Sequence, residues 1–290
     1  MKDSSKYIVP KGRRLWFKIY KGFLKIFKRK PEIINLNEKL EDKAIYVSNH
    51  SAASGPIVLE LYFPKAFIPW GTYQMCGNYK ERWNYLYHTY CQDKKHFNKF
   101  VSFWYSTIAA VLTKPFYSGM QLIPTYPDAR MIGTIKRSIK ILDSNKAVLL
   151  FPEDSSKGYM EVLTEYFAGF VTLAKMYYKR TGIDVPIYPV YFHNKAKKLI
   201  IGKPEYVQPL LASGMSEKEI SMMLKDRANE LCAKYVFGEN KKELNLVLFI
   251  FAISNGNLRR IGLSLHIRKA LQNQKNLMSM NIFPKGRVFA

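Results

Sequence analysis

The chain has 290 residues, 48% of them hydrophobic and 14% aromatic, which is enough to fold around one substantial core. The 46 Lys and Arg against 22 Asp and Glu give a formal net charge of +24, which suits anionic partners such as lipid surfaces, nucleic acids and phosphorylated or acyl-CoA-like ligands. The three cysteines form no Cys-x-x-Cys pair, which argues against a disulfide framework or a cysteine zinc site and is typical of a cytoplasmic protein.

Residues 11–30 predict a basic amphipathic helix, and we take 1–35 as an N-terminal segment. The stretch carries nine basic residues and no acidic one. At helical spacing one side gathers the larger apolar residues, which are Trp16, Ile19, Tyr20, Phe23, Ile26 and Phe27. Such a helix can lie in the interface of an anionic membrane. In the alternative interpretation, the apolar side covers the domain's own core and the lysines are solvated.

The first predicted strand ends at a histidine. A polar connector over 32–43 leads to an apolar run over 44–47, which stops at Ser48, Asn49 and His50. In α/β folds, ligand sites lie at the carboxyl ends of strands. Gly55 and Pro56 then open a helix over 57–63, and we expect the positive end of that helix near His50.

Residues 65–118 are rich in aromatic side chains, and we expect helices that form a wall over the active face. Trp70 and Met75 are candidates to line a tunnel there. His88, Cys91 and His96 could be imagined as metal ligands, but a fourth ligand is not evident. We therefore interpret these three as ordinary side chains and predict no metal.

The next elements predict a β-α-β unit: a strand over 121–125, a helix from Thr134, and a strand over 147–151. The last strand ends in a polar cluster that contains Glu153, Asp154, Ser155 and Lys157. We expect this strand end to meet the first one, with Glu153 and Ser155 beside His50.

The remaining elements complete a predicted domain over 36–240. A helix over 161–180 precedes a proline-interrupted strand over 185–190, which suits a position where a ladder hydrogen bond is missing. A strand over 198–202 follows, and then a helix that opens with a capping box at Ser216. Residues 241–290 form a basic C-terminal tail of unknown role, because no acidic residue follows Glu243 and the apolar run 244–253 is too short to span a membrane.

Three of these runs, taken in order, resemble the glycerolipid acyltransferase family, which includes the lysophosphatidic acid acyltransferases. The family blocks are Asn-His-x4-Asp, Phe-Pro-Glu-Gly-Thr-Arg-Ser and Val-Pro-Ile-x-Pro-Val. They correspond here to Asn49-His50, to Phe151-Pro152-Glu153 with Ser155, and to residues 185–190, so that the resemblance covers roughly residues 14–205. It implies a single α/β domain with a mixed, mostly parallel central sheet flanked by helices.

The chain departs from the family at three positions and resembles a diverged member. Gly55 stands where the family has the aspartate that orients the histidine. Ser156, followed by Lys157, replaces the arginine of the third block. The second block survives only as residues 119–125, and its nearest arginine is Arg130.

The resemblance implies acyl transfer from acyl-CoA or acyl carrier protein, without a cofactor, to a glycerol-phosphate or lysophospholipid-like hydroxyl. His50 and Glu153 would be catalytic, with His50 as the base, since its ordinary pKa of about 6.5 suits that role. Asn49, Ser155, Lys157 and Arg130 would bind the substrate. In place of the missing aspartate, Glu60, Asp154, a carbonyl or a water would hold the imidazole.

Membrane lipids at an anionic bilayer surface are the expected partners, with the protein peripheral at the cytoplasmic, inner face of the membrane. No run of eighteen uncharged apolar residues occurs, and the first residues lack a secretory pattern. A weakly active or inactive acyltransferase-like protein that binds lipid remains the alternative. Nucleic-acid binding would rest on the net charge alone, because we find no RNA-binding signature and no zinc-finger spacing.

Overall fold

The computed structural model describes residues 7–51, 54–154 and 158–238. In that part of the chain one sheet has the strand order β1-β7-β6-β2-β5-β3-β4 and is parallel at every pairing except β6 with β7. The predicted α/β class with a mixed, mostly parallel sheet is therefore confirmed. The strands are β1 (Glu32–Asn35), β2 (Ile45–Ser48), β3 (Phe67–Thr72), β4 (Ile123–Thr125), β5 (Ala147–Leu150), β6 (Ile187–His193) and β7 (Lys198–Ile201).

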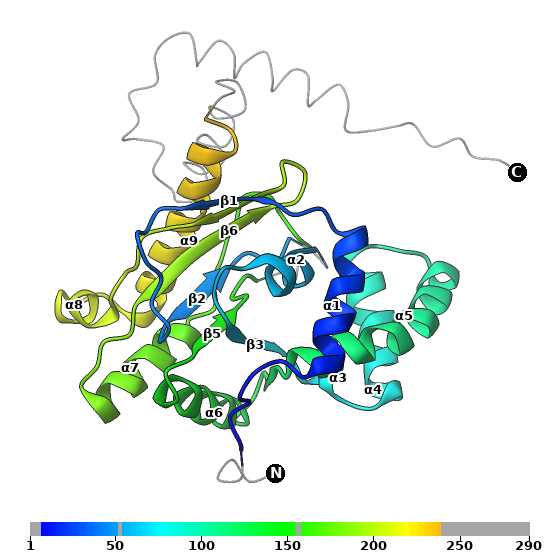
Figure 1. Cartoon of the computed structure of the whole chain (residues 1–290), viewed down its shortest axis with the longest axis horizontal. Coiled ribbons are helices and arrows are strands. Elements are labelled where there is room, and N and C mark those ends of the chain that lie inside the picture. Colours follow the sequence, from blue (N-terminus) through cyan, green and yellow to red (C-terminus); the bar gives the residue numbers. More distant parts are fainter. Residues whose placement is uncertain (1–6, 52–53, 155–157, 239–290) are drawn as a thin grey trace, which may run out of the picture. The chain divides into compact units, whose positions relative to one another are not determined.

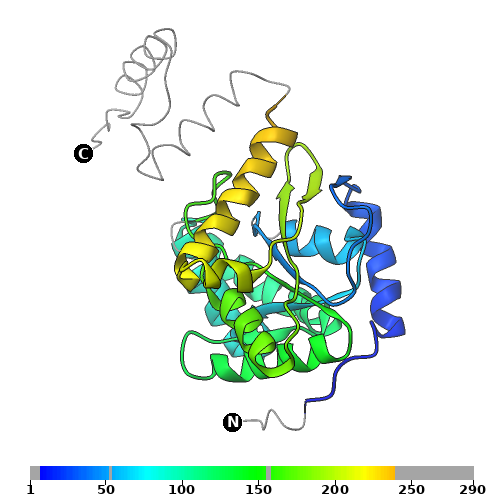
Figure 2. The ribbon, with the colours of Figure 1, turned by 90° about the vertical axis from the view of Figure 1, so that its left-hand side faces the viewer.

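Helices flank both faces of this sheet (Figure 1). In the side view, α9 lies on one side of the sheet, and α1 and α2 lie on the other (Figure 2). A π-helical segment, Tyr85–Lys94, joins α4 to α5. The helices are α1 (Leu15–Phe27), α2 (Ser54–Tyr62), α3 (Tyr73–Cys76), α4 (Tyr79–Asn84), α5 (Lys99–Met120), α6 (Met131–Asp143), α7 (Gly169–Thr181), α8 (Val207–Ala212) and α9 (Glu217–Tyr235).

The core is centred on β2, β5 and β6, in which every residue is buried. Strands covered on both faces carry continuous apolar runs, which is why these three could be read directly from the sequence. The predicted capping box of α9 is also confirmed: the Ser216 hydroxyl accepts from the Glu219 N–H at 3.2 Å, and the Glu219 carboxylate accepts from the Ser216 N–H at 2.8 Å.

Two strands occupy stretches for which we predicted something else. β1 lies in the predicted polar connector, where Ile33 and Ile34 pair in parallel with β7. β3 lies in the region predicted to be helical, between β5 and β4. Both are short, and both owe their conformation to neighbours distant in sequence, which local patterns do not report.

The predicted helix over 161–180 begins only at Gly169. The residues before it run alongside the loop after β5: Phe167 N–H donates to the Pro152 carbonyl at 2.8 Å, and Asp154 N–H donates to the Glu165 carbonyl at 3.1 Å. These main-chain bonds replace the expected helical turns and hold the loop that carries Glu153.

Pro189 lies inside β6, a central strand, where a missing N–H would leave a carbonyl without its donor. The facing residue is Gly202, whose N–H donates to the Pro189 carbonyl at 2.8 Å. The carbonyl of Gly202 accepts instead from the Asn37 side-chain amide at 2.9 Å. A side chain thus supplies the hydrogen bond that the proline cannot, as the predicted gap in the ladder requires.

The N-terminal helix α1 packs on α5 through Phe17, which is fully buried. The Phe17 ring lies 6.1 Å from that of Phe116 and directly over Gly119, where an added Cβ would fall 2.0 Å from the ring. Of the predicted apolar side of α1, Ile19, Phe23 and Ile26 are exposed, whereas Tyr20 packs against the buried cluster of Phe17, Phe116 and Met120. That side therefore covers the core only in part.

A buried carboxylate fastens α1 to α2. Glu60, whose side chain is only 2% exposed, accepts from Arg13 at 2.6 and 2.9 Å and from Lys21 at 2.9 Å. Arg13 also donates to the Met120 and Phe67 carbonyls. These bonds tie the start of α1 to α2, to the end of α5 and to the start of β3.

Replacing Glu60 with alanine is expected to lower the free energy of unfolding by about 2 kcal/mol, less than for a fully buried pair because Arg13 and Lys21 are partly exposed. Chemical denaturation of the full chain measures it. Glu38→Ala, at an exposed position, is the control and should change stability by less than about 0.5 kcal/mol. Equal stability of the two variants would contradict a role for Glu60 as a clamp.

Among the described helices, none combines the length and the apolar character needed to cross a bilayer. The predicted tail over 241–290 lies outside the described residues.

Candidate active site

The ends of β2 and β5 meet, as predicted. The two strands are adjacent and parallel, with Ile45 opposite Val148, so their carboxyl ends share one edge of the sheet. There the Glu153 carboxylate accepts from the backbone N–H of His50 at 2.8 Å. Glu153 therefore supports the main chain at His50, and it does not belong to the wall of the cavity that His50 lines.

Glu153 is buried, and burial raises the pKa of its carboxyl to about 7. The N–H groups of His50 and Met160 and the nearby Lys94 ammonium oppose this increase, because each favours the charged form. The carboxyl thus changes charge close to neutral pH while it holds the loop of the candidate base.

The partly buried His50 ring packs near two aromatic rings. The centroid of Phe151 is 5.1 Å away and that of Tyr159 is 4.9 Å away. The ammonium groups of Lys94 and Lys95 lie 5.4 and 5.7 Å from the centre of the Tyr159 ring. Two positive charges therefore lie near Tyr159, whose ring is next to the imidazole.

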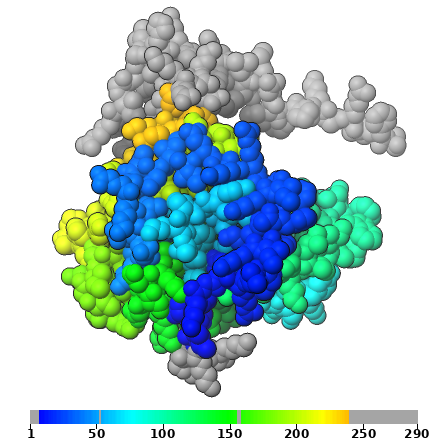
Figure 3. Space-filling view, in the orientation of Figure 1, coloured from blue at the N-terminus to red at the C-terminus, as the bar shows by residue number. Residues whose placement is uncertain are grey.

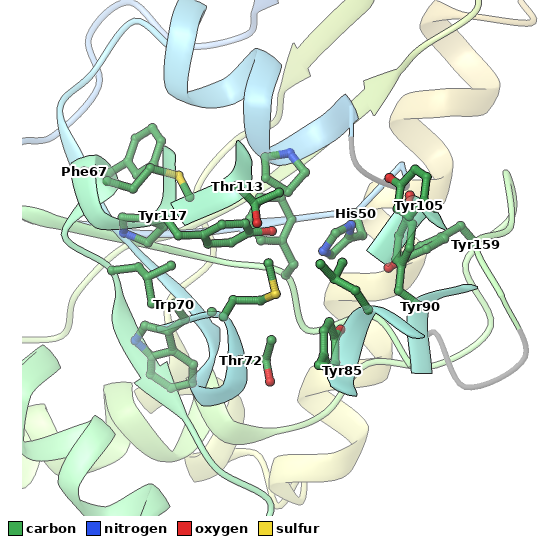
Figure 4. Close-up of a pocket in the computed structure, with 18 residues that line it drawn as sticks. His50, Phe67, Trp70, Thr72, Tyr85, Tyr90, Tyr105, Thr113, Tyr117 and Tyr159 are labelled. Atoms are coloured by element: carbon green, nitrogen blue, oxygen red, sulfur yellow. The ribbon is translucent and has the colours of Figure 1, made fainter. Parts of the chain in front are cut away.

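His50 lines a cavity of about 110 Å³ (Figure 4). β3, the π-helical segment and α5 supply most of its wall, and both Trp70 and Met75 belong to it as predicted. Five tyrosines also line it: Tyr85, Tyr90, Tyr105, Tyr117 and Tyr159.

Burial raises the pKa of all five tyrosines, so their hydroxyls stay protonated at neutral pH and can donate hydrogen bonds. The rest of the wall is largely apolar. No individual tyrosine could be identified from the sequence, although the aromatic richness of residues 65–118 was the signal that this region forms a wall.

Gly55 occupies a position with no room for a side chain. An added Cβ would lie 2.1 Å from the His50 carbonyl oxygen and 2.9 Å from its carbon. With this backbone, an aspartate could not stand where the family has one. Glu60, which we expected as a possible replacement, is instead bound to Arg13 and Lys21.

Replacing Gly55 with alanine is expected to lower the free energy of unfolding by about 2 kcal/mol, because the new methyl group meets a backbone oxygen that cannot move away on its own. Gly133→Ala in α6 is the matched control: its Cβ would meet nothing within 4 Å, and alanine favours a helix. Thermal denaturation compares them. A Gly55 variant as stable as the Gly133 variant would contradict the close approach.

Asn49 and Arg130, which were also predicted as site residues, do not line the cavity. Asn49 is buried, and its side chain exchanges two hydrogen bonds with the Phe192 backbone, at 3.0 and 2.7 Å. Both groups of the amide thus join the end of β2 to β6, and the predicted role of Asn49 in binding substrate stays a prediction.

Arg130 stands exposed at the start of α6 and is not among the residues that line the cavity. Its guanidinium binds Asp128 at 2.6 Å and stacks on Tyr126, 4.4 Å from the ring centre. Ser155 and Lys157 lie outside the described residues, so their predicted roles stay predictions.

In the described part of the chain, no group of three or more His, Cys, Asp or Glu side chains is arranged to hold a metal ion. Cys91 is buried with its sulfur 3.8 Å from the Ser106 hydroxyl, and the His88 ring packs edge-on against Tyr87.

No family model and no curated protein matches this chain. The case for a function therefore depends on the geometry around His50 and on the sequence blocks that carry it.

Proposed function

We propose that this protein transfers an acyl group from a thioester, acyl-CoA or acyl carrier protein, to the hydroxyl of a glycerol-phosphate or lysophospholipid-like acceptor at the cytoplasmic surface of a membrane. The observation that carries the proposal is the position of His50 at a strand end, with its ring in the wall of a largely apolar cavity. An acyl chain suits such a wall, and an imidazole suits the proton transfer.

In this reaction His50 accepts the proton of the acceptor hydroxyl as its oxygen attacks the thioester carbonyl carbon. The negative charge on the carbonyl oxygen needs hydrogen-bond donors, for which the protonated tyrosine hydroxyls of the cavity are the candidates. The carbon–sulfur bond then breaks, and the leaving thiolate takes up the proton from the imidazole. Products are an ester and a free thiol.

Glu153 accepts a hydrogen bond from the His50 backbone N–H, and we assign it a role in positioning His50. Lys94 and Lys95 bring positive charge near the ring of Tyr159, where a phosphate on the acceptor would be favoured. Ser155 and Lys157 follow Glu153 closely in the sequence and remain candidates for contacts with the acceptor.

The test is release of free thiol from long-chain acyl-CoA and acyl carrier protein, with glycerol 3-phosphate and several lysophospholipids as acceptors. Ester formation that depends on His50 supports the proposal. Turnover that is the same in wild type and in His50→Ala removes His50 as the base.

A second candidate is an acyltransferase-like protein that binds lipid without turning it over. The specific observation in its favour is that Gly55 leaves no room for the orienting aspartate, while Glu60 is engaged elsewhere. It predicts that a fluorescent fatty acid or lysophospholipid binds wild type and His50→Ala equally, with no ester formed by either. Robust turnover by the wild type would exclude it.

A further inference from the structure

The outer side of α5 is an exposed apolar surface. This helix has 22 residues, two lysines and no acidic residue. Its large exposed side chains recur at helical spacing along the side that faces away from the core; they are Phe100, Val101, Phe103, Trp104, Ile108, Val111 and Leu112. Single exposed apolar residues are ordinary, but a continuous row over three turns marks a contact surface.

The opposite side of α5 packs against the rest of the protein. Ser102, Ser106, Ala110 and Phe116 are buried, and Thr113 and Tyr117 line the His50 cavity. Because the inner side already packs against the protein, the apolar outer side needs a nonpolar partner of its own.

The helix α1 lies beside α5 and also has an exposed apolar side. The two helices pack through Phe17 and Phe116, and in the space-filling view the surface of α1, in blue, borders the teal region near residue 100 (Figure 3). The exposed apolar residues of α1 repeat the spacing of those on α5: Leu15, Ile19, Phe23 and Ile26, compared with Phe100, Trp104, Ile108 and Val111. Neither helix contains an acidic residue.

We propose that the outer side of α5, together with the exposed side of α1, enters the headgroup layer of an anionic bilayer. This inference rests on the proposed membrane location and adds α5, whose inner side walls the cavity, as a membrane-contacting helix. A single helix then separates the lipid from the site of His50. An acyl chain would reach that site from the leaflet past α5.

Three partners could cover the exposed side of α5: a bilayer, a second copy of the chain, and the chain's own apolar run 244–253. Charge favours the bilayer. A second copy of the chain carries the same net charge of +24 and would bring like charges together. The apolar run 244–253, outside the described residues, belongs to a segment with several Lys and Arg and no acidic residue after Glu243. Among these three possible partners, only an anionic bilayer offers charge complementary to the nine basic residues of 11–30.

The test compares vesicle binding of full-length variants. Ile108→Asp alters the α5 surface, and Ile132→Asp on α6 is matched in residue type and exposure, at 57% and 54% exposed respectively. With vesicles of phosphatidylglycerol and phosphatidylcholine, we expect Ile108→Asp to bind about tenfold more weakly, as for the loss of one buried aliphatic side chain. Ile132→Asp should bind within about twofold of wild type. Equal binding by the two variants overturns the proposal.

A second measurement uses Trp104, which is 53% exposed. In a chain whose other three tryptophans are replaced by phenylalanine, brominated lipid should quench Trp104 upon binding, and acrylamide should quench it only in the absence of vesicles. Trp104 shielded from acrylamide without lipid would mean that the chain itself or a second copy covers α5, which overturns the proposal. Because neither measurement uses a substrate, failure of acyl transfer would leave this inference standing.

Discussion

Replacing His50 with alanine is expected to lower the rate of thioester-dependent ester formation by about 100- to 10,000-fold, the range for loss of a positioned general base. The imidazole lines the cavity next to Phe151 and Tyr159, and alanine removes the proton acceptor while leaving the backbone N–H that Glu153 binds. Stability should therefore change little. Free-thiol release under saturating donor and acceptor measures the effect, with circular dichroism to compare the folds.

The matched control for this substitution is His88→Ala. His88 is an exposed histidine on the π-helical segment and does not line the cavity. We expect turnover by this variant within about twofold of wild type. If both histidine variants lose activity equally, or neither does, His50 is not the base.

Replacing Glu153 with glutamine is expected to make the protein more stable at neutral and alkaline pH. Burial raises the pKa of the folded-state carboxyl from its ordinary value of 4.5 to about 7. Below pH 4.5 both folded and unfolded chains are protonated, so this group has no effect. As the pH rises from 4.5 to 7, the unfolded chain releases its proton first, which favours unfolding; above 7 the loss of stability is complete.

This loss amounts to about 3 kcal/mol, because one pKa unit corresponds to about 1.4 kcal/mol. Glutamine keeps an oxygen that can accept from the His50 N–H but does not ionise. The difference in free energy of unfolding, Glu153→Gln minus wild type, should therefore rise by about 3 kcal/mol between pH 4.5 and 8. Urea denaturation at several pH values measures it. A pH-independent difference would show that Glu153 ionises with an ordinary pKa.

The central strands could be predicted because each is buried on both faces. Such a strand has a continuous run of apolar residues in the sequence. β2, β5 and β6 all have this pattern. β1 and β3 could not be predicted, because their conformation depends on pairing with β7 and with β5 and β4 rather than on their own residues. The same applies to the residues before Gly169, which pair with the loop after β5.

At the candidate site, residue type and strand position were enough to bring His50 and Glu153 together. They were not enough to say which atoms meet. Glu153 binds the His50 main chain, Asn49 binds the Phe192 main chain, and Arg130 is turned to Asp128. The first two contacts depend on backbone groups that lie close only after the chain has folded, whereas Asp128 is a side-chain partner two residues from Arg130 in the sequence.

The amino-acid sequence by itself determined the α/β class, the meeting of two strand ends at His50, and an acid-free, basic N-terminal helix, because periodicity, strand-end polarity and charge are local properties. The tertiary structure decided which side of α1 is buried, why Gly55 cannot be aspartate, and that α5 carries a cavity wall on one side and an exposed apolar row on the other. Those facts depend on distances between residues far apart in the chain, and only packing sets such distances.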